Sequence, residues 1–209
     1  MLSGTPVEIT EQIKKFCKEI EKSQKPVYVS VKPDPESKIQ DCFLNVKAKV
    51  EKDGGQIQFG WAIVESPKMM NEAQFHAIWV SPENEHIDIT PSERGGVQRI
   101  LFLPDTALEY DYVSDCKRIC NKFQPLTANP LVHRFIVLTQ QIFDIEETHS
   151  TGRLIDLRGL VLEQFEELKQ ERALIYLQLM SQPQRGEPRR NDPCSCGSGL
   201  KFKKCCGKQ

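Results

Sequence analysis

Hydrophobic positions in the first hundred residues repeat with two spacings, one typical of helices and one typical of strands. An N-terminal helix is predicted from apolar residues that return every three or four positions, namely Ile9, Ile13, Phe16, Cys17 and Ile20. Residues 5–8 (TPVE) have the composition of a helix start. A second helix is predicted over residues 41–52 and ends at Gly54-Gly55.

Strands are predicted where short runs are rich in β-branched and aromatic residues. These runs cover residues 26–31, 57–64, 75–80, 86–91 and 96–103. Gly60 interrupts one of them, and a glycine inside a strand indicates that another backbone approaches closely. Beyond residue 105 the pattern becomes helical, with helices predicted at 111–123, 129–148 and 155–181.

Composition and charge narrow the class of protein. The chain has 209 residues, of which 39% are hydrophobic and 27% charged, and its net charge is −1. These values are ordinary for a soluble globular protein, and none of them points to nucleic acid or a membrane. No apolar run approaches the roughly 20 residues that span a bilayer, and the N-terminus lacks the pattern of a secretory signal. We therefore expect a cytoplasmic protein, in which clustered cysteines indicate a metal site or catalysis more often than disulfides.

Four of the eight cysteines lie close together near the C-terminus, with the spacing C-x-C-x₈-C-C. They are Cys194, Cys196, Cys205 and Cys206. Four thiolates complete a tetrahedral zinc shell. A segment this short has no core of its own, so metal binding would supply its folding free energy. A closed shell has no open coordination position, which favours a structural role over a catalytic one.

The tail closely resembles the SEC-C motif, which is found at the C-terminus of the SecA translocase ATPase and appended to many other bacterial proteins. The resemblance rests on three short runs, Asn191-Asp192-Pro193-Cys194, Gly197-Ser198-Gly199 and Cys205-Cys206. It implies that the four tail cysteines bind Zn²⁺. In SecA the module contacts the chaperone SecB, so the resemblance also implies a protein partner, such as a chaperone or an export-type factor.

The tail is basic whereas the rest of the chain is acidic. Residues 185–209 contain seven Lys or Arg and two acidic residues, which gives +5 before thiolates are counted and leaves −6 for the remainder. Such a tail could dock on an acidic protein surface or on ribosomal RNA. The plainer interpretation is that the charge only keeps the tail soluble.

Cys42, His76 and Asp88 form a second candidate site. Alternate side chains of a strand share a face, so neighbouring antiparallel strands could set Asp88 beside His76. Cys42 lies in the first turn of a predicted helix, where unpaired N–H groups and the helix dipole favour a thiolate. A Cys–His–Asp set serves acyl transfer, because the carboxylate orients the imidazole and the imidazole activates the thiol. Two alternatives stay open: Cys42 is a buried core residue, or His86 is the base.

The order of these residues is similar to that in the papain/transglutaminase-like superfamily of cysteine enzymes. The similarity spans roughly residues 26–103 and rests on two short runs, Phe75-His76-Ala77-Ile78-Trp79 and Asp88-Ile89-Thr90-Pro91. It implies that Cys42 is the nucleophile, His76 the general base and Asp88 the orienting carboxylate. Gln40 and the backbone N–H of Cys42 are the candidate donors to an oxyanion.

Together these patterns predict an α+β fold: a small antiparallel sheet with a packed helix, a helical C-terminal extension and a short zinc-binding tail. The predicted boundaries are 1–105 for the α+β domain, 106–182 for the helical extension, 183–190 for a polar linker and 191–209 for the zinc module.

The leading hypothesis is a cytoplasmic zinc-binding protein with a thiol hydrolase or acyltransferase domain that acts on a peptide or amide bond and is recruited by its tail. The rival hypothesis is a non-catalytic adaptor or accessory protein of the export machinery or the ribosome.

Overall fold

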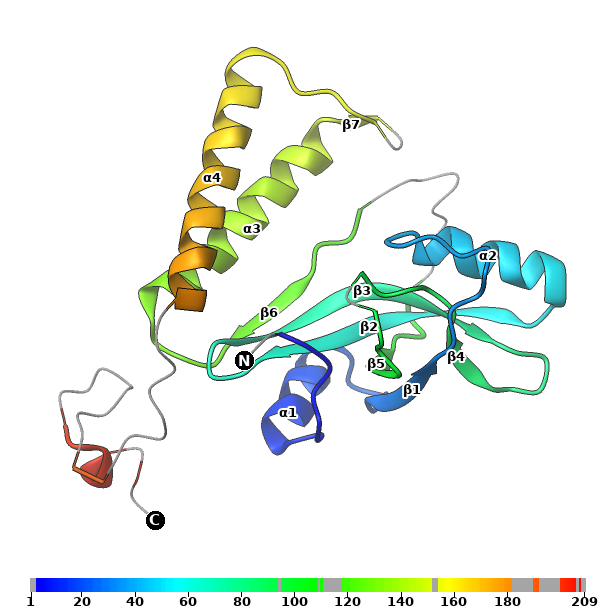
Figure 1. Ribbon diagram of the computed structural model, residues 1–209, viewed down its shortest axis with the longest axis horizontal. Helices are drawn as coiled ribbons and strands as arrows, with labels where there is room; N and C mark the ends of the chain where they lie inside the picture. The colour runs from blue at the N-terminus through cyan, green and yellow to red at the C-terminus, as the bar shows by residue number, and fades with distance from the viewer. Residues whose placement is uncertain are drawn as a thin grey trace. The chain divides into compact units, whose positions relative to one another are not determined.

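The computed structural model describes residues 3–93, 95–108, 110, 118–151, 154–181, 190–191, 200–205 and 207. The chain divides into two compact units, one that ends at Gln124 and one that begins at Pro125. Figure 1 shows the elements of both. Those that begin in the first unit are α1 (Glu11–Ile20), β1 (Val27–Val31), α2 (Cys42–Asp53), β2 (Gln56–Ser66), β3 (Met70–Val80), β4 (His86–Asp88), β5 (Arg99–Pro104) and β6 (Lys122–Pro125).

Five strands of the first unit close into a small barrel. Their order is β2-β5-β1-β4-β3, and β3 pairs back onto β2 along its whole length, while β6 adds to β3. Neighbouring barrel strands are antiparallel except β1 and β4, which run parallel. The predicted antiparallel sheet is therefore wrong at this pair. The chain leaves β1 and reaches β4 only after α2, β2 and β3, which is the long crossover that parallel neighbours require.

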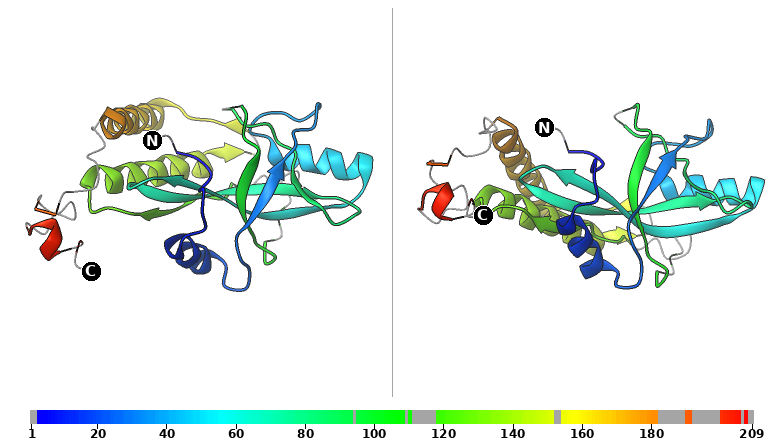
Figure 2. Two further views of the ribbon diagram at one scale, coloured as in Figure 1. Left: turned by 60° about the horizontal axis from the view of Figure 1, so that its bottom comes forward. Right: turned by 90° about the horizontal axis from the view of Figure 1, so that it is seen from below.

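The alternation of side chains gives the barrel an apolar interior and two covered outer surfaces. Figure 2 shows the two covering helices, α1 in dark blue and α2 in cyan. A buried apolar cluster inside the barrel consists of Val29, Ile78 and Phe102. One outer surface packs against α1, through Ile13, Phe16, Cys17, Trp61, Ile63, Leu101 and Leu103. The other packs against α2, through Val46, Ala77, Ile87 and Ile89. Residues of β3 and β4 that face away from α2 therefore point into the barrel.

The first helix begins later than its sequence pattern predicted. Gly4 forms two backbone hydrogen bonds with Glu65 of β2, of 3.0 and 2.8 Å, so the chain here runs beside a strand. The hydroxyl of Thr10 accepts a hydrogen bond from the N–H of Ile13 at 3.3 Å and caps the helix. The predicted start at residues 5–8 is therefore wrong, because Thr10 supplies the cap.

Gly60 lies in the middle of β2, opposite His76 on β3 and Pro104 on β5. A Cβ atom built there would be 2.3 Å from the carbonyl oxygen of Leu103 and 2.6 Å from Cζ of Phe102. The close backbone approach predicted at Gly60 is therefore confirmed. Gly60 also leaves the space that the Phe102 ring occupies inside the barrel.

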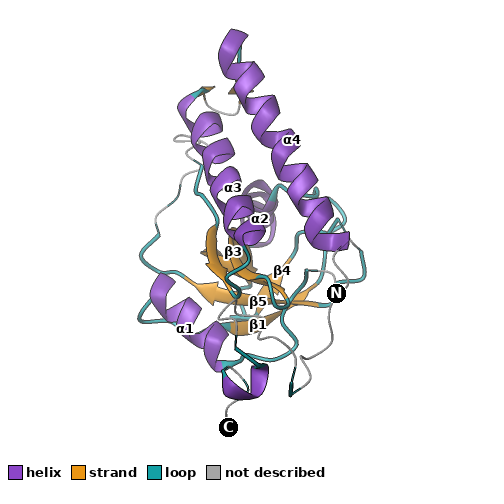
Figure 3. Cartoon of the chain, turned by 90° about the vertical axis from the view of Figure 1, so that its left-hand side faces the viewer, coloured by secondary structure: helices purple, strands orange, loops and turns teal. Residues whose placement is uncertain are grey.

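The second unit contains two long helices, α3 (Pro130–Thr148) and α4 (Gly159–Ser181), with the short strands β7 (Ser150–Thr151) and β8 (Leu154–Ile155) between them. The two helices pack side by side (Figure 3). Arg134 on α3 donates two hydrogen bonds, of 2.7 and 2.6 Å, to Glu171 on α4. The side chain of Asn129 accepts from the N–H of Leu131 and caps α3. The helix predicted at 129–148 is thus present, whereas the one predicted at 155–181 begins only at Gly159, because Leu154–Ile155 forms β8.

The helix predicted over residues 111–123 is not confirmed. Residues 111–117 lie outside the described residues, and Lys122–Pro125 forms β6. The end of that prediction is therefore wrong, because pairing with the barrel sheet selects an extended backbone there. Within the described part of the chain, no helix is both long and apolar enough to cross a membrane.

Candidate functional site

The structure brings His76 and Asp88 together inside the barrel. Trp79 and Val80 of β3 pair with Ile87 and His86 of β4, and this register places Asp88 diagonal to His76 on the interior face. Nε2 of His76 lies 3.2 Å from Oδ2 of Asp88, and the two side chains are only 16% and 6% exposed. The contact has the distance of an ion pair but not the alignment of a hydrogen bond.

Cys42 is the first residue of α2 and is buried, with 8% of its surface exposed. The N-cap residue, Asp41, makes no side-chain hydrogen bond to the helix, so the first-turn N–H groups around Cys42 are not capped by it. Phe43, the next residue, packs on Phe75 with ring centroids 5.1 Å apart. This aromatic contact holds the start of α2 on the outer face of β3 at Phe75, and the next residue, His76, points to the opposite, interior face.

The pKa of His76 is raised by interactions with both other residues of the candidate site. Burial by itself lowers this pKa, but hydrogen bonding and charge from Asp88 and Cys42 outweigh burial and raise it to about 10. The buried Asp88 carboxylate, 3.2 Å from Nε2, favours the positively charged imidazolium through its charge. At neutral pH the imidazole of His76 is therefore positively charged, and it interacts with both the Asp88 carboxylate and the Cys42 side chain.

His86, the alternative base, is exposed at the start of β4. The interaction with Cys42 and Asp88 is made by His76. The geometry therefore favours His76 as the base of any thiol site in this barrel.

A cleft of about 400 Å³ reaches the same histidine and aspartate. Its apolar lining comes from the barrel interior and includes Val31, Ala62, Val64 and Ile100. Its polar lining includes Gln74, His76, Asp88 and Thr90. Cys42 is not among the lining residues, so a molecule in the cleft would meet the imidazole and carboxylate before the sulfur.

Gln40 lies two residues before Cys42 and lines the same cleft. Its φ angle of 63° is in the left-handed region, which is costly for a residue other than glycine and recurs at functional sites. Its side-chain amide donates a hydrogen bond to Glu93, another lining residue. The Gln40 amide, a predicted donor to an oxyanion, therefore already donates to the Glu93 carboxylate.

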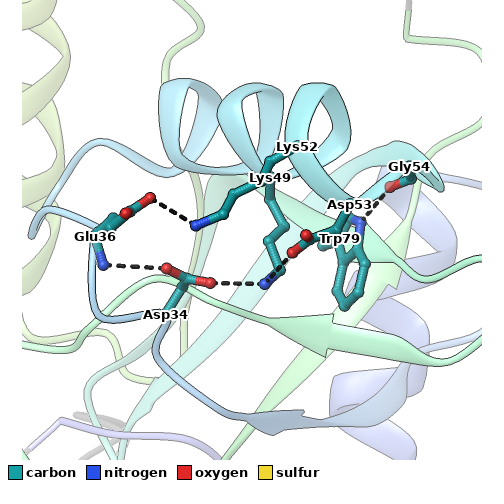
Figure 4. A network of polar contacts seen from close by, with 7 residues as sticks. All are labelled: Asp34, Glu36, Lys49, Lys52, Asp53, Gly54 and Trp79. Carbon is teal, nitrogen blue, oxygen red and sulfur yellow. Dashed lines mark hydrogen bonds and ion pairs between the residues drawn. The ribbon is translucent and has the colours of Figure 1, made fainter.

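A charged network that the sequence pattern did not reveal fastens the loop before Cys42 to α2 (Figure 4). Lys49 lies 2.7 Å from Asp34 and 2.6 Å from Asp53, and Lys52 lies 3.1 Å from Glu36. The hydrogen bond from Lys49 is the largest cause that lowers the pKa of Asp34. These contacts hold the loop against the C-terminal half of α2.

The tail is described only in part. Cys194, Cys196 and Cys206 lie outside the described residues, whereas Cys205 follows a short 3₁₀ helix, η1 (Phe202–Lys204). The N–H of Lys203 donates to the carbonyl of Arg190 at 3.1 Å, which brings the segment before the first cysteine pair next to the segment before the second. Among the described residues, no group of three or more His, Cys, Asp or Glu could hold a metal ion.

The comparisons with known proteins concern this tail. Residues 190–208 match the SEC-C motif. The chain is similar to "Protein translocase subunit SecA" of Heliobacterium modesticaldum (strain ATCC 51547 / Ice1), with 68% identity over 31 residues, which are 14% of this chain and 4% of that protein. It is also similar to "Protein translocase subunit SecA" of Nitratidesulfovibrio vulgaris (strain DSM 19637 / Miyazaki F), with 76% identity over 25 residues, which are 11% and 3% of the two chains.

The chain thus spans only a few per cent of the length of these relatives. No solved structure matches it. The likeness establishes a SEC-C motif at the C-terminus, and the barrel lies outside the matched motif.

Proposed function

We propose that the barrel carries a thiol site of the papain/transglutaminase-like kind, which acts on a peptide or amide bond. In this proposal Cys42 is the nucleophile, His76 the general base and acid, and Asp88 the orienting carboxylate. The observation that carries the proposal is the imidazole of His76, which is 16% exposed and whose pKa is raised by its interactions with both Asp88 and Cys42.

The chemistry follows from the protonation states. The thiolate of Cys42 attacks the carbonyl carbon of the substrate, and the carbonyl oxygen becomes an oxyanion. As the C–N bond breaks, the imidazolium of His76 gives its proton to the leaving amine, and a thioester remains on Cys42. Neutral His76 then takes a proton from water or from an acceptor amine, which attacks the thioester, and the C–S bond breaks to release the Cys42 thiolate. Asp88 holds Nε2, so Nδ1 is the ring nitrogen left to exchange protons with Cys42 and substrate.

The cleft supports approach of the substrate from the barrel interior. Its apolar walls suit an aliphatic group, and Gln74 and Thr90 offer hydrogen-bonding groups near His76. The N–H of Cys42 is the candidate donor to the oxyanion, since the Gln40 amide is engaged with Glu93.

The first test is the pH dependence of Cys42 alkylation by iodoacetamide, followed by peptide mass spectrometry. We expect labelling of Cys42 below pH 7, because the thiolate is the reactive form and an imidazolium stabilises it. His76→Ala should slow labelling at pH 6.5 by at least about tenfold. Cys17 is an internal reference, because burial raises the pKa of its thiol to about 12, and His86→Ala is the matched control.

Slow labelling of Cys42 that is the same in wild type and His76→Ala would reject the thiol site. The barrel would then be the body of an adaptor, which is the second candidate function. The exclusion of Cys42 from the cleft lining is the observation that favours this alternative.

We further propose that Cys194, Cys196, Cys205 and Cys206 bind one structural Zn²⁺. The donor set suits it, because four thiols in C-x-C-x₈-C-C spacing fill a tetrahedral shell. The hydrogen bond between Lys203 and Arg190, which brings the segments before the two cysteine pairs together, also supports the site.

Purified protein is expected to contain one equivalent of zinc, and Cys205→Ser is expected to lose it, because removing one thiolate opens the shell. Metal content after dialysis measures this, with Cys42→Ser as the matched control that keeps its zinc. Equal zinc in wild type and Cys205→Ser would contradict the assignment.

The motif supports recruitment to a protein partner in the cytoplasm. Its occurrence in a protein translocase subunit favours a chaperone or another export-type factor. Ribosomal RNA is the less favoured partner, and it requires salt-sensitive binding through Arg189, Arg190 and the tail lysines.

A further inference from the structure

Asn45 is a buried polar residue on α2, one turn after Cys42. Its Oδ1 accepts a hydrogen bond from the N–H of Lys38 at 2.9 Å. Its Nδ2 donates to the carbonyl of Lys38 at 2.7 Å and to the hydroxyl of Thr90 at 3.3 Å. The side chain therefore uses its acceptor and both donor hydrogens, although asparagine is unfavourable inside a helix. A buried polar side chain whose hydrogen bonds are all made fixes the geometry of the groups that it joins.

The contact with Thr90 continues toward the imidazole. The N–H of Thr90 donates to Oδ1 of Asp88 at 3.0 Å, and both residues are buried. The other carboxylate oxygen, Oδ2, is the one that lies 3.2 Å from His76. A continuous series of polar contacts thus runs from the helix of Cys42 to the ring of His76.

We propose that Asn45 is a positioning residue that holds Cys42, His76 and Asp88 in one arrangement. It fixes the loop that enters α2 by bonding to both backbone groups of Lys38. Through Thr90 it fixes the strand end that carries Asp88. This inference rests on the proposed thiol site, and it adds a residue that touches neither the sulfur nor the imidazole.

Apolar packing alone does not supply this alignment. Val46 and Phe43 hold α2 on the outer surface of the barrel, but such contacts are non-directional. The carboxylate of Asp88 lies inside the barrel, and its terminal torsion is broad. A hydrogen bond from the N–H of Thr90 to Oδ1 removes that freedom and leaves Oδ2 directed at His76. The hydrogen bond between Asn45 and Thr90 connects the segment that carries the Asp88 carboxylate to α2 on the outer surface.

The test uses two substitutions of Thr90 in the full-length, zinc-loaded protein. Thr90→Val removes the hydroxyl that accepts from Asn45 but keeps the size of the side chain and the backbone N–H. Thr90→Ser keeps the hydroxyl. The readout is the protonation midpoint of the His76 imidazole in ¹⁵N-histidine NMR spectra, assigned by the signal lost in His76→Gln. Alkylation of Cys42 at pH 6.5 is measured in parallel.

We expect Thr90→Val to lower the His76 midpoint by about one pH unit, a tenfold change in its protonation constant. Thr90→Ser should remain close to wild type. Lys49→Met is the matched control, because it removes a different contact between the same loop and the same helix. It should lower stability against urea and leave the His76 midpoint unchanged.

If Thr90→Val lowers stability but leaves the His76 midpoint at its wild-type value, Asn45 is only a structural clamp and the inference is overturned. The inference is also overturned if the Lys49→Met control shifts the His76 midpoint by the same amount. Failure of the proposed function is separate: Cys42 would react slowly in wild type, while the imidazole would still report whether Thr90 positions Asp88.

Discussion

Gly60→Ala is expected to destabilise the barrel by about 3 kcal/mol, at the upper end of the cost of overpacking. The new methyl group would lie 2.3 Å from the Leu103 carbonyl oxygen, 2.6 Å from Phe102 and 3.0 Å from Cα of Pro104. Two of these three atoms belong to backbone, so a change of side-chain rotamer cannot relieve the clash. Gly60 is also paired on both sides, so β2 cannot move away from β5 without stretching its ladder with β3.

Urea unfolding followed by tryptophan fluorescence measures this effect, because Trp61 lies beside the site of change. Gly4→Ala is the matched control: a Cβ at Gly4 meets nothing within 4 Å, and its substitution should change stability by less than about 0.5 kcal/mol. Equal midpoints for the two variants would show that β2 and β5 do not approach as closely as the structure has them.

Asp88→Asn is expected to lower the protonation midpoint of His76 by at least about two pH units, a hundredfold change in its protonation constant. The largest influence on the pKa of His76 is burial, which lowers it. The Asp88 carboxylate is the largest influence that raises it, so its loss lets burial act with less opposition. Wild-type His76 should stay protonated up to about pH 10, whereas the variant should lose its proton well below that pH.

¹⁵N-histidine NMR gives this midpoint directly, and Cys42 labelling at pH 6.5 should fall together with it. Asp105→Asn is the matched control, since Asp105 is also buried and accepts a hydrogen bond from Trp61 Nε1 at 3.0 Å. If the asparagine variant at position 88 keeps the wild-type midpoint, Asp88 does not hold the imidazole, and the proposed order of Asp88, His76 and Cys42 fails.

Predictions that depend only on residues close together in the sequence were more accurate than those that depend on contacts between distant segments. The alternation of side chains along a strand predicted that His76 and Ala77 of β3 face opposite sides of the sheet. Asn129-Pro130 marks the start of α3. The tail motif is local in the same sense. The first helix shows the limit of such signals, because Thr5 and Thr10 can both cap a helix. The pairing of Gly4 with Glu65 leaves Thr10 as the cap.

The mutual geometry of the candidate site depends on contacts between distant segments. The sequence offered Cys42, His76 and Asp88 as residue types, with His86 as the alternative base. Only the register between β3 and β4 directs Asp88 toward His76 and leaves His86 exposed. The contact between Asn45 and Thr90 gave no signal in the sequence, because their hydrogen bond joins residues 45 positions apart.

The sequence by itself determined the periodic elements, the glycine that a close strand requires and the spacing of the tail cysteines, since each depends on residues within a few positions of one another. The tertiary structure decided that the sheet closes, that β1 and β4 run parallel and that Thr90 connects α2 to Asp88. These features follow from which strands find one another, and that choice minimises exposed apolar surface and open strand edges over the whole chain.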